Sequence, residues 1–168
     1  MFLFNNLGVL GDLAVYHMNT FAEPDKRADE LAHVVIGAAI EVHRQLGPGF
    51  LESIYEEALT LELADAGLAF VRQKEIGVVY KGRVIGKHRL DLLVGEQLVV
   101  ELKTVEELAA IHKAQVISYL KATGLSLGLL INFNVPLLKD GVQRVVCTNQ
   151  QNAKVPSAPG RMDHLKSN

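Results

Sequence analysis

Three charged side chains interrupt the two predicted apolar strands that a tight turn joins between Leu90 and Lys103. Asp91 lies on one predicted strand, and Glu101 and Lys103 lie on the next, where alternate side chains point to the same face. Charges in buried strands are costly unless a partner compensates them. An acid followed on the next strand by Glu-x-Lys is the arrangement that metal-dependent phosphodiester hydrolysis needs.

Asp91 and Glu101 can approach each other at one end of this hairpin. With the backbone carbonyl of Leu102 they would form an oxygen-rich site for a hard ion such as Mg²⁺, or Mn²⁺ in its place. Such an ion polarises a phosphodiester and activates a water, and Lys103 could orient that water or stabilise the developing charge. A buried salt bridge between Lys103 and one carboxylate is the alternative. We favour catalysis, because stability alone poorly explains three such groups in one strand pair.

A second group of residues begins the second predicted helix, in the run Gly49-Phe50-Leu51-Glu52-Ser53-Ile54-Tyr55. Glu52 opens that helix, where a carboxylate also suits the helix dipole, and taken alone this explains Glu52 better than catalysis. Tyr55 lies one turn later, so the two side chains share a face. Glu56 falls just outside this face and is expected to be solvated.

A third group lies on the third predicted helix, where His112, Gln115 and Tyr119 are spaced i, i+3 and i+7. This spacing places them on one stripe, and Gln115 could contact a phosphate or a metal-bound water. A helix edge with ordinary hydrogen bonds is the alternative. We prefer that alternative for His112 alone, and the two interpretations are balanced for Gln115 and Tyr119.

Cations gather on the first predicted hairpin. Arg89 is two residues from Asp91 and should share its face, near a phosphate bound at the metal. Lysines also serve to keep an edge hairpin soluble, and we prefer this explanation for Lys81 and Lys87. For Arg89 both explanations stay open. The full set comprises Lys74, Lys81, Arg83, Lys87, His88 and Arg89, with Lys113 and Lys121 on the third helix.

Apolar periodicity and turn residues predict the element order α-α-β-β-β-α-β-β. The helices are expected over 29–46, 51–66 and 106–123, and the strands over 75–80, 83–94, 98–103, 126–132 and 143–148. A meander followed by a crossover helix indicates an α/β protein with a central mixed sheet flanked by helices. The strand that carries Glu101 is apolar on both faces and should be central.

Composition limits the possible partners and location. The length suits one domain, expected over 28–148, with a loosely ordered extension at 1–27 and a frayed tail at 149–168. No segment has the length and apolarity of a membrane span. The lone Cys147 excludes an internal disulfide and a cysteine zinc cage, and we expect it in the core of a reduced, cytoplasmic protein.

The overall charge is weak, with a net value of −2 and a pI near 6.3. Any contact with nucleic acid must therefore rest on a local patch rather than on general basicity. A chain with this weak charge could still bind nucleic acid in one of two ways. A homodimer could assemble a wider groove, or a partner could deliver the substrate.

Several separated motifs carry a family resemblance. The sequence Gly49-x-x-Glu52-x-x-Tyr55 resembles the signature of the GxxExxY protein family, which is placed in the PD-(D/E)xK nuclease-like superfamily. The resemblance covers residues 31–146 and extends to further segments in the same order: Ile36–His43, Asp91–Val94, Val100–Lys103, Tyr119–Gly124 and Leu129–Phe133.

The resemblance implies a restriction-endonuclease-like core and a metal-dependent nuclease acting on DNA or RNA. Residue by residue, it makes Glu52 the helix-borne first acid, Asp91 the principal metal ligand, Glu101 the second acid and Lys103 the catalytic lysine. Gln115 and Tyr119 match a Q-x-x-x-Y element, whereas Leu90 stands where the superfamily pattern has a proline, a residue that is often missing there. The expected metal ligands are Glu52, Asp91, Glu101 and Leu102, and the expected substrate contacts are Tyr55, Arg89 and Tyr119.

Two alternatives to the nuclease hypothesis remain. The first is a non-catalytic module on a nuclease fold that binds nucleic acid or regulates another protein. The second is a structural protein whose acidic cluster is only a network of salt bridges.

Overall fold

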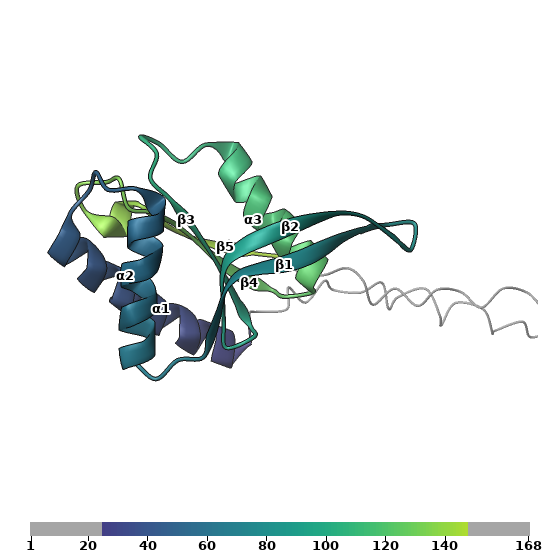
Figure 1. The fold of residues 1–168 in the computed structure, drawn as a ribbon, viewed down its shortest axis with the longest axis horizontal. Coiled ribbons are helices and arrows are strands. Elements are labelled where there is room, and N and C mark those ends of the chain that lie inside the picture. The colour runs from purple at the N-terminus through teal and green to yellow at the C-terminus, as the bar shows by residue number, and fades with distance from the viewer. Residues whose placement is uncertain (1–24, 148–168) are drawn as a thin grey trace, which may run out of the picture.

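The structure, a computed structural model, describes residues 25–147 and has the predicted α/β architecture (Figure 1). Two helices precede a three-strand meander, and a third helix then leads to the last two strands. In chain order the elements are α1 (Lys26–Leu46), α2 (Glu52–Asp65), β1 (Phe70–Tyr80), β2 (Arg83–Val94), β3 (Leu98–Lys103), α3 (Ala110–Thr123), β4 (Leu127–Asn132), the 3₁₀ turn η1 (Leu138–Asp140) and β5 (Val142–Val146).

The five strands form one mixed sheet in the order β1-β2-β3-β4-β5. β3 and β4 run parallel, and the other neighbours are antiparallel. Parallel neighbours need a crossover, and α3 supplies it on one face of the sheet, while α1 and α2 cover the other face (Figure 1). The fold prediction is confirmed, including the central place of the strand that carries Glu101.

Two apolar clusters hold the helices to the sheet. One joins α1 and α2 to the sheet and contains Tyr55 and Leu59, and the other joins α3 to the opposite face. Gly128 on β4 allows α3 to approach closely, since a Cβ there would lie 2.6 Å from Cγ1 of Val116. No helix of residues 25–147 combines the length and apolarity that a bilayer span requires.

The structure corrects three predicted element boundaries. α1 begins at Lys26, because the side chain of Asp25 accepts a hydrogen bond from the Arg27 N–H and caps the helix. β1 begins at Phe70 rather than at residue 75. α3 begins only at Ala110, after a loop that follows β3. The predicted extension over 1–27 thus overlaps α1, and its residues 1–24 and the tail at 149–168 lie outside the described residues.

The loop between β3 and α3 is held by a buried side chain that the sequence analysis did not single out. Asn132, at the end of β4, accepts a hydrogen bond from the Val105 N–H at 3.1 Å and donates one to the Val105 carbonyl at 2.8 Å. The side-chain amide of Asn132 therefore satisfies both backbone groups of Val105, as a neighbouring strand would. This clamp holds the chain at Val105, ahead of the start of α3 at Ala110.

The alternation of side chains between the two faces of the sheet is interrupted in β2 at Asp91. Leu90 packs in the cluster beneath α3, whereas Leu92 packs in the cluster beneath α1 and α2, although alternate residues of a regular strand share a face. The pairing of β2 with β3 covers only three residue pairs, from Leu92↔Val100 to Val94↔Leu98. The outer part of β2 therefore leaves the sheet and projects with β1 as a hairpin (Figure 1). The predicted shared face of Arg89 and Asp91 assumed unbroken alternation, which fails at this point.

Candidate active site

Asp91 lies where β2 separates from β3, and its carboxylate takes over the pairing that the backbone has lost. Oδ2 accepts a hydrogen bond from the Leu102 N–H at 2.8 Å, and Oδ1 lies 3.4 Å from Nε2 of Gln73. Burial raises the pKa of Asp91, while the Leu102 N–H and the charge of Lys103 oppose the rise. The carboxylate is thereby fixed against the edge of β3.

Glu101 is 2 % exposed, and only one of its carboxylate oxygens has a partner among residues 25–147. Its Oε1 accepts a hydrogen bond from Nζ of Lys103 at 2.5 Å, whereas the buried Oε2 accepts none from this part of the chain. Burial and, after it, the charge of Asp91 raise the pKa of Glu101 to about 7. Two neighbouring carboxylates in this setting favour the uptake of positive charge.

Lys103 supplies part of that charge. Its ammonium donates to Glu101 and, at 2.9 Å, to the carbonyl of Leu102. Burial lowers the pKa of Lys103, but the bond to Glu101 and the surrounding carboxylates outweigh burial and the net shift is upward. The ammonium therefore contacts two of the oxygen donors that the sequence assigned to a metal ion.

Glu52 approaches the cluster from the N-terminus of α2 and is half-buried. Burial raises its pKa, the charge of Lys103 lowers it, and the charges of Asp91 and Glu56 raise it again. Glu52 is thus within electrostatic reach of the strand residues. The structure brings it near them from a different element, the placement that the family resemblance implies for the first acid.

Tyr55 positions the loop in front of Glu52 rather than facing solvent. Its ring is fully buried and stacks on Phe133 with centroids 4.4 Å apart. Its hydroxyl donates to the carbonyl of Gly47 at 2.6 Å and accepts from the N–H of Phe50 at 3.2 Å. The predicted contact between Tyr55 and substrate is not supported, because both the ring and the hydroxyl are already engaged.

Glu56 is buried and paired, so the expectation that it is solvated is wrong. It is 8 % exposed, and its carboxylate accepts hydrogen bonds from Arg72 at 2.8 Å and from Gln73 at 2.6 Å. Both partners lie in the part of β1 that the sequence analysis left out of the strand. Gln73, which has a φ of 49°, links Glu56 to Asp91 and is a site residue that was missed.

α3 faces the same cluster through Gln115 and Tyr119. Nε2 of Gln115 donates to the hydroxyl of Tyr119 at 2.5 Å. Burial raises the pKa of Tyr119, the bond to Gln115 lowers it, and the charges of Glu101 and Asp91 raise it. His112 instead accepts a hydrogen bond from the Ala109 N–H at 3.1 Å, which confirms the ordinary helix-end interpretation for that residue.

Arg89 lies apart from these residues. It is exposed on the projecting hairpin and lines a hollow with Glu75, Lys87 and His88. The side-chain charges that shift the pKa of Asp91 belong to Lys103 and Glu56. The structure therefore does not bring Arg89 to the acidic cluster, and the interruption of the strand at Asp91 explains why.

The donor set fits a divalent ion held by two carboxylates. Within residues 25–147, no three His, Cys, Asp or Glu side chains stand close enough together to hold a metal ion. Asp91, the unpartnered Oε2 of Glu101 and the Leu102 carbonyl nevertheless give hard oxygen donors around one point of β3. Mg²⁺ commonly uses one or two protein carboxylates and completes its shell with waters and substrate phosphates.

Comparison with known families agrees with this geometry. The family model of the PD-(D/E)XK nuclease superfamily matches residues 29–145, a span that includes every residue of the cluster. No curated protein matches the sequence significantly.

Proposed function

Because the chain belongs to the PD-(D/E)XK nuclease superfamily, we propose that it is a metal-dependent nuclease that hydrolyses phosphodiester bonds of nucleic acid. Within the superfamily we assign it to the GxxExxY family. The observation that carries the proposal is the buried, unpartnered oxygen of Glu101 beside the fixed carboxylate of Asp91. Such a pair is costly for folding alone and suits a site that takes up a cation.

In this proposal Asp91, Glu101 and the Leu102 carbonyl hold Mg²⁺, for which Mn²⁺ can substitute. When bound, the ion supplies Lewis acidity to the phosphodiester and to an attacking water. Glu52 serves as the third acid, and the influence of its charge on the pKa values of Glu101 and Lys103 supports that role.

The remaining polar side chains act on the substrate directly. Lys103 gives up its contacts with Glu101 and the Leu102 carbonyl and donates to the water or to a phosphate oxygen. Gln115 and Tyr119 contact the phosphate from α3. The hydrogen bond between them fixes both side chains in position for this contact. The polypeptide therefore orients the reactants and stabilises charge.

A second candidate function is a non-catalytic module that binds nucleic acid. The observation that favours it is the ammonium of Lys103, which already neutralises Glu101 and satisfies the Leu102 carbonyl without an ion. Such a module would bind nucleic acid independently of metal and would not cleave it. Metal-dependent cleavage separates the two candidates.

The test is an assay of single-stranded and duplex DNA and RNA in Mg²⁺, in Mn²⁺ and in a chelator. We expect cleavage that requires the metal and disappears in Asp91→Ala. Asp65→Ala is the matched control, since Asp65 is exposed at the far end of α2 from Glu52. Binding without cleavage in any metal would favour the non-catalytic module.

Two assignments concern the protein as a whole. We propose a cytoplasmic location, supported by a single cysteine that is free. We also propose a homodimer, because the weak net charge of −2 argues against tight nonspecific binding by one copy. Light scattering at several protein concentrations tests the dimer.

A further inference from the structure

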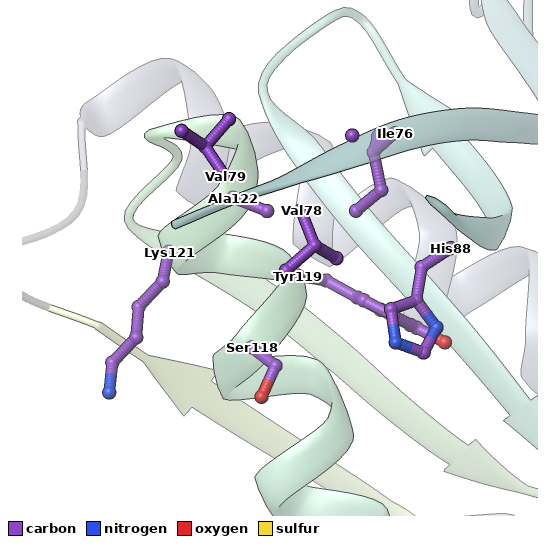
Figure 2. A pocket seen from close by; sticks show the side chains of 9 residues that line it. Ile76, Val78, Val79, His88, Ser118, Tyr119, Lys121 and Ala122 are labelled. Atoms are coloured by element: carbon purple, nitrogen blue, oxygen red, sulfur yellow. The ribbon is translucent and has the colours of Figure 1, made fainter. Parts of the chain in front are cut away.

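A hollow of about 560 Å³ lies between the projecting β1–β2 hairpin and α3. Figure 2 shows side chains of the hairpin facing those of the helix across it. Its volume falls within the range of ligand pockets, about 300–1,000 Å³. The lining residues are Ile76, Gly77, Val78, Val79 and His88 from the hairpin, and Ser118, Tyr119, Lys121 and Ala122 from the helix.

The lining is suited to a flat ring. The exposed ring of His88 meets the buried ring of Tyr119, a residue that is 2 % exposed, edge to face with centroids 5.5 Å apart, and the aliphatic side chain of Val78 points toward them from β1 (Figure 2). Ser118 and the exposed Lys121 complete the lining; the Ser118 hydroxyl donates to the Ala114 carbonyl at 3.0 Å, and the Lys121 side chain extends away from the two rings (Figure 2). Nucleobases bind proteins through aromatic and apolar contacts of this kind, with cations nearby for the backbone.

Tyr119 joins this hollow to the acidic cluster. Its ring lines the hollow, while its hydroxyl accepts the hydrogen bond from Gln115. Glu101 and Asp91 act on the same hydroxyl through their charges. A polymer whose phosphodiester lies at the cluster would therefore have its next residue beside the hollow.

We propose that the hollow between the hairpin and α3 binds an unpaired nucleobase next to the phosphodiester that is cut. The substrate is then single-stranded nucleic acid or a strand end with unpaired bases. In a duplex the faces of the bases are covered by stacking, so a base must leave the stack before it can enter the hollow. The inference rests on the proposed nuclease function, since it takes the bound polymer to be nucleic acid.

The test measures binding without cleavage, in a chelator, by fluorescence anisotropy. The probes are a labelled single strand, DNA or RNA, the same strand in a duplex, and an abasic strand of equal length and charge. Base stacking predicts that the wild type prefers the base-bearing strand over the abasic strand by about 5- to 150-fold. It should also bind the single strand more tightly than the duplex.

A filled hollow should remove that preference. Ala122→Trp places an indole in the hollow from the exposed face of α3, and Ala64→Trp makes the same change on α2, away from the hollow. We expect Ala122→Trp to bind base-bearing and abasic strands alike and Ala64→Trp to bind as the wild type does. His88→Ala removes a ring instead of adding one and should reduce the preference, which covers the case in which Ala122→Trp does not fold.

Two results would overturn the base-binding site. One is equal affinity of the wild type for base-bearing and abasic strands, and the other is an unchanged preference in a folded Ala122→Trp. The metal-dependent cleavage assay reports separately on the nuclease. Cleavage without base-dependent binding overturns only the base-binding site, base-dependent binding without cleavage overturns only the nuclease, and no binding of any strand overturns the base-binding site.

Discussion

The carboxylate of Asp91 accepts the backbone N–H of Leu102 at the point where β2 separates from β3. This bond replaces a ladder hydrogen bond with a side-chain one, and it brings Asp91 next to Glu101 and Lys103. The same separation releases the outer hairpin to pass over α3. One local break in strand pairing thus creates both the acidic cluster and the hollow beside it.

Asp91→Ala should destabilise the protein by about 1–3 kcal/mol, because it leaves the Leu102 N–H without its acceptor. Asp91→Asn should cost less, since an amide oxygen can still accept that bond. Urea unfolding of both variants measures the difference. A loss in Asp91→Ala no larger than that in Asp65→Ala would contradict the structural role of the bond.

Glu101 should make the protein less stable as the pH rises. Its pKa is raised from 4.5 to about 7 on folding, so the folded state binds the extra proton between these values. Stability should then fall with rising pH by at most about 1.4 kcal/mol per pH unit in this window. The difference in unfolding free energy between wild type and Glu101→Gln, followed from pH about 4.5 to about 7, isolates this contribution. A difference that is constant with pH would refute it.

Lys103→Met should destabilise the protein strongly at a pH about two units above the Glu101 pKa of about 7, where the Glu101 carboxylate is ionised. Removing one partner of a buried ion pair typically costs about 3–5 kcal/mol, because the other charge stays buried without compensation. The double variant Lys103→Met/Glu101→Gln removes both charges and should recover much of the loss. Chemical denaturation of the two single variants and the double variant gives the coupling energy, and a coupling near zero would argue against the pair.

Tyr55→Phe should loosen the loop before Glu52. The change keeps the buried ring but removes the hydroxyl that bonds Gly47 and Phe50, at a cost of about 1 kcal/mol. We expect lower nuclease activity with the fold intact, since Tyr55 positions Glu52 without touching substrate. Tyr80→Phe, at the exposed hairpin tip, is the matched control and should change neither quantity. Full activity in Tyr55→Phe would rule out this positioning role.

Asn132→Ala should release the loop that follows Lys103. The variant leaves Val105 without the partners of its N–H and its carbonyl and should cost about 2–4 kcal/mol, at about 1–2 kcal/mol for each bond. Faster amide hydrogen exchange in residues 104–109 would locate the effect. Asn134→Ala, two residues away and half-buried, should leave that exchange unchanged. Unaltered protection of the loop in Asn132→Ala would contradict the clamp.

Periodicity predicted the sheet, its central strand and the stripe of Gln115 and Tyr119, because each rests on regular alternation or helical spacing. The same rule failed at Asp91, where the alternation in β2 is interrupted and the expected shared face with Arg89 is lost. The change of face accompanies the packing of Leu90 in the cluster beneath α3, a contact between distant elements that no local pattern encodes.

Other features escaped the sequence because they depend on contacts between distant elements. The buried Glu56 is paired with Arg72 and Gln73 on β1, and the polar run at these positions gave no strand signal. Asn132 at the end of an apolar strand was a usable signal, since a buried amide there requires partners. Tyr55 belongs to the motif, yet its role in holding the loop appears only once the hydroxyl bonds are known.

The central claim is that Asp91 and Glu101 form a divalent-ion site, and a thermal unfolding series tests it most directly. Wild type, Asp91→Ala and Asp65→Ala are each unfolded in a chelator, in Mg²⁺ and in Mn²⁺. An ion that binds only the folded state raises the Tm by mass action. We expect a rise for wild type and Asp65→Ala that is absent in Asp91→Ala. No rise for wild type in either ion, or an equal rise in Asp91→Ala, would contradict the claim.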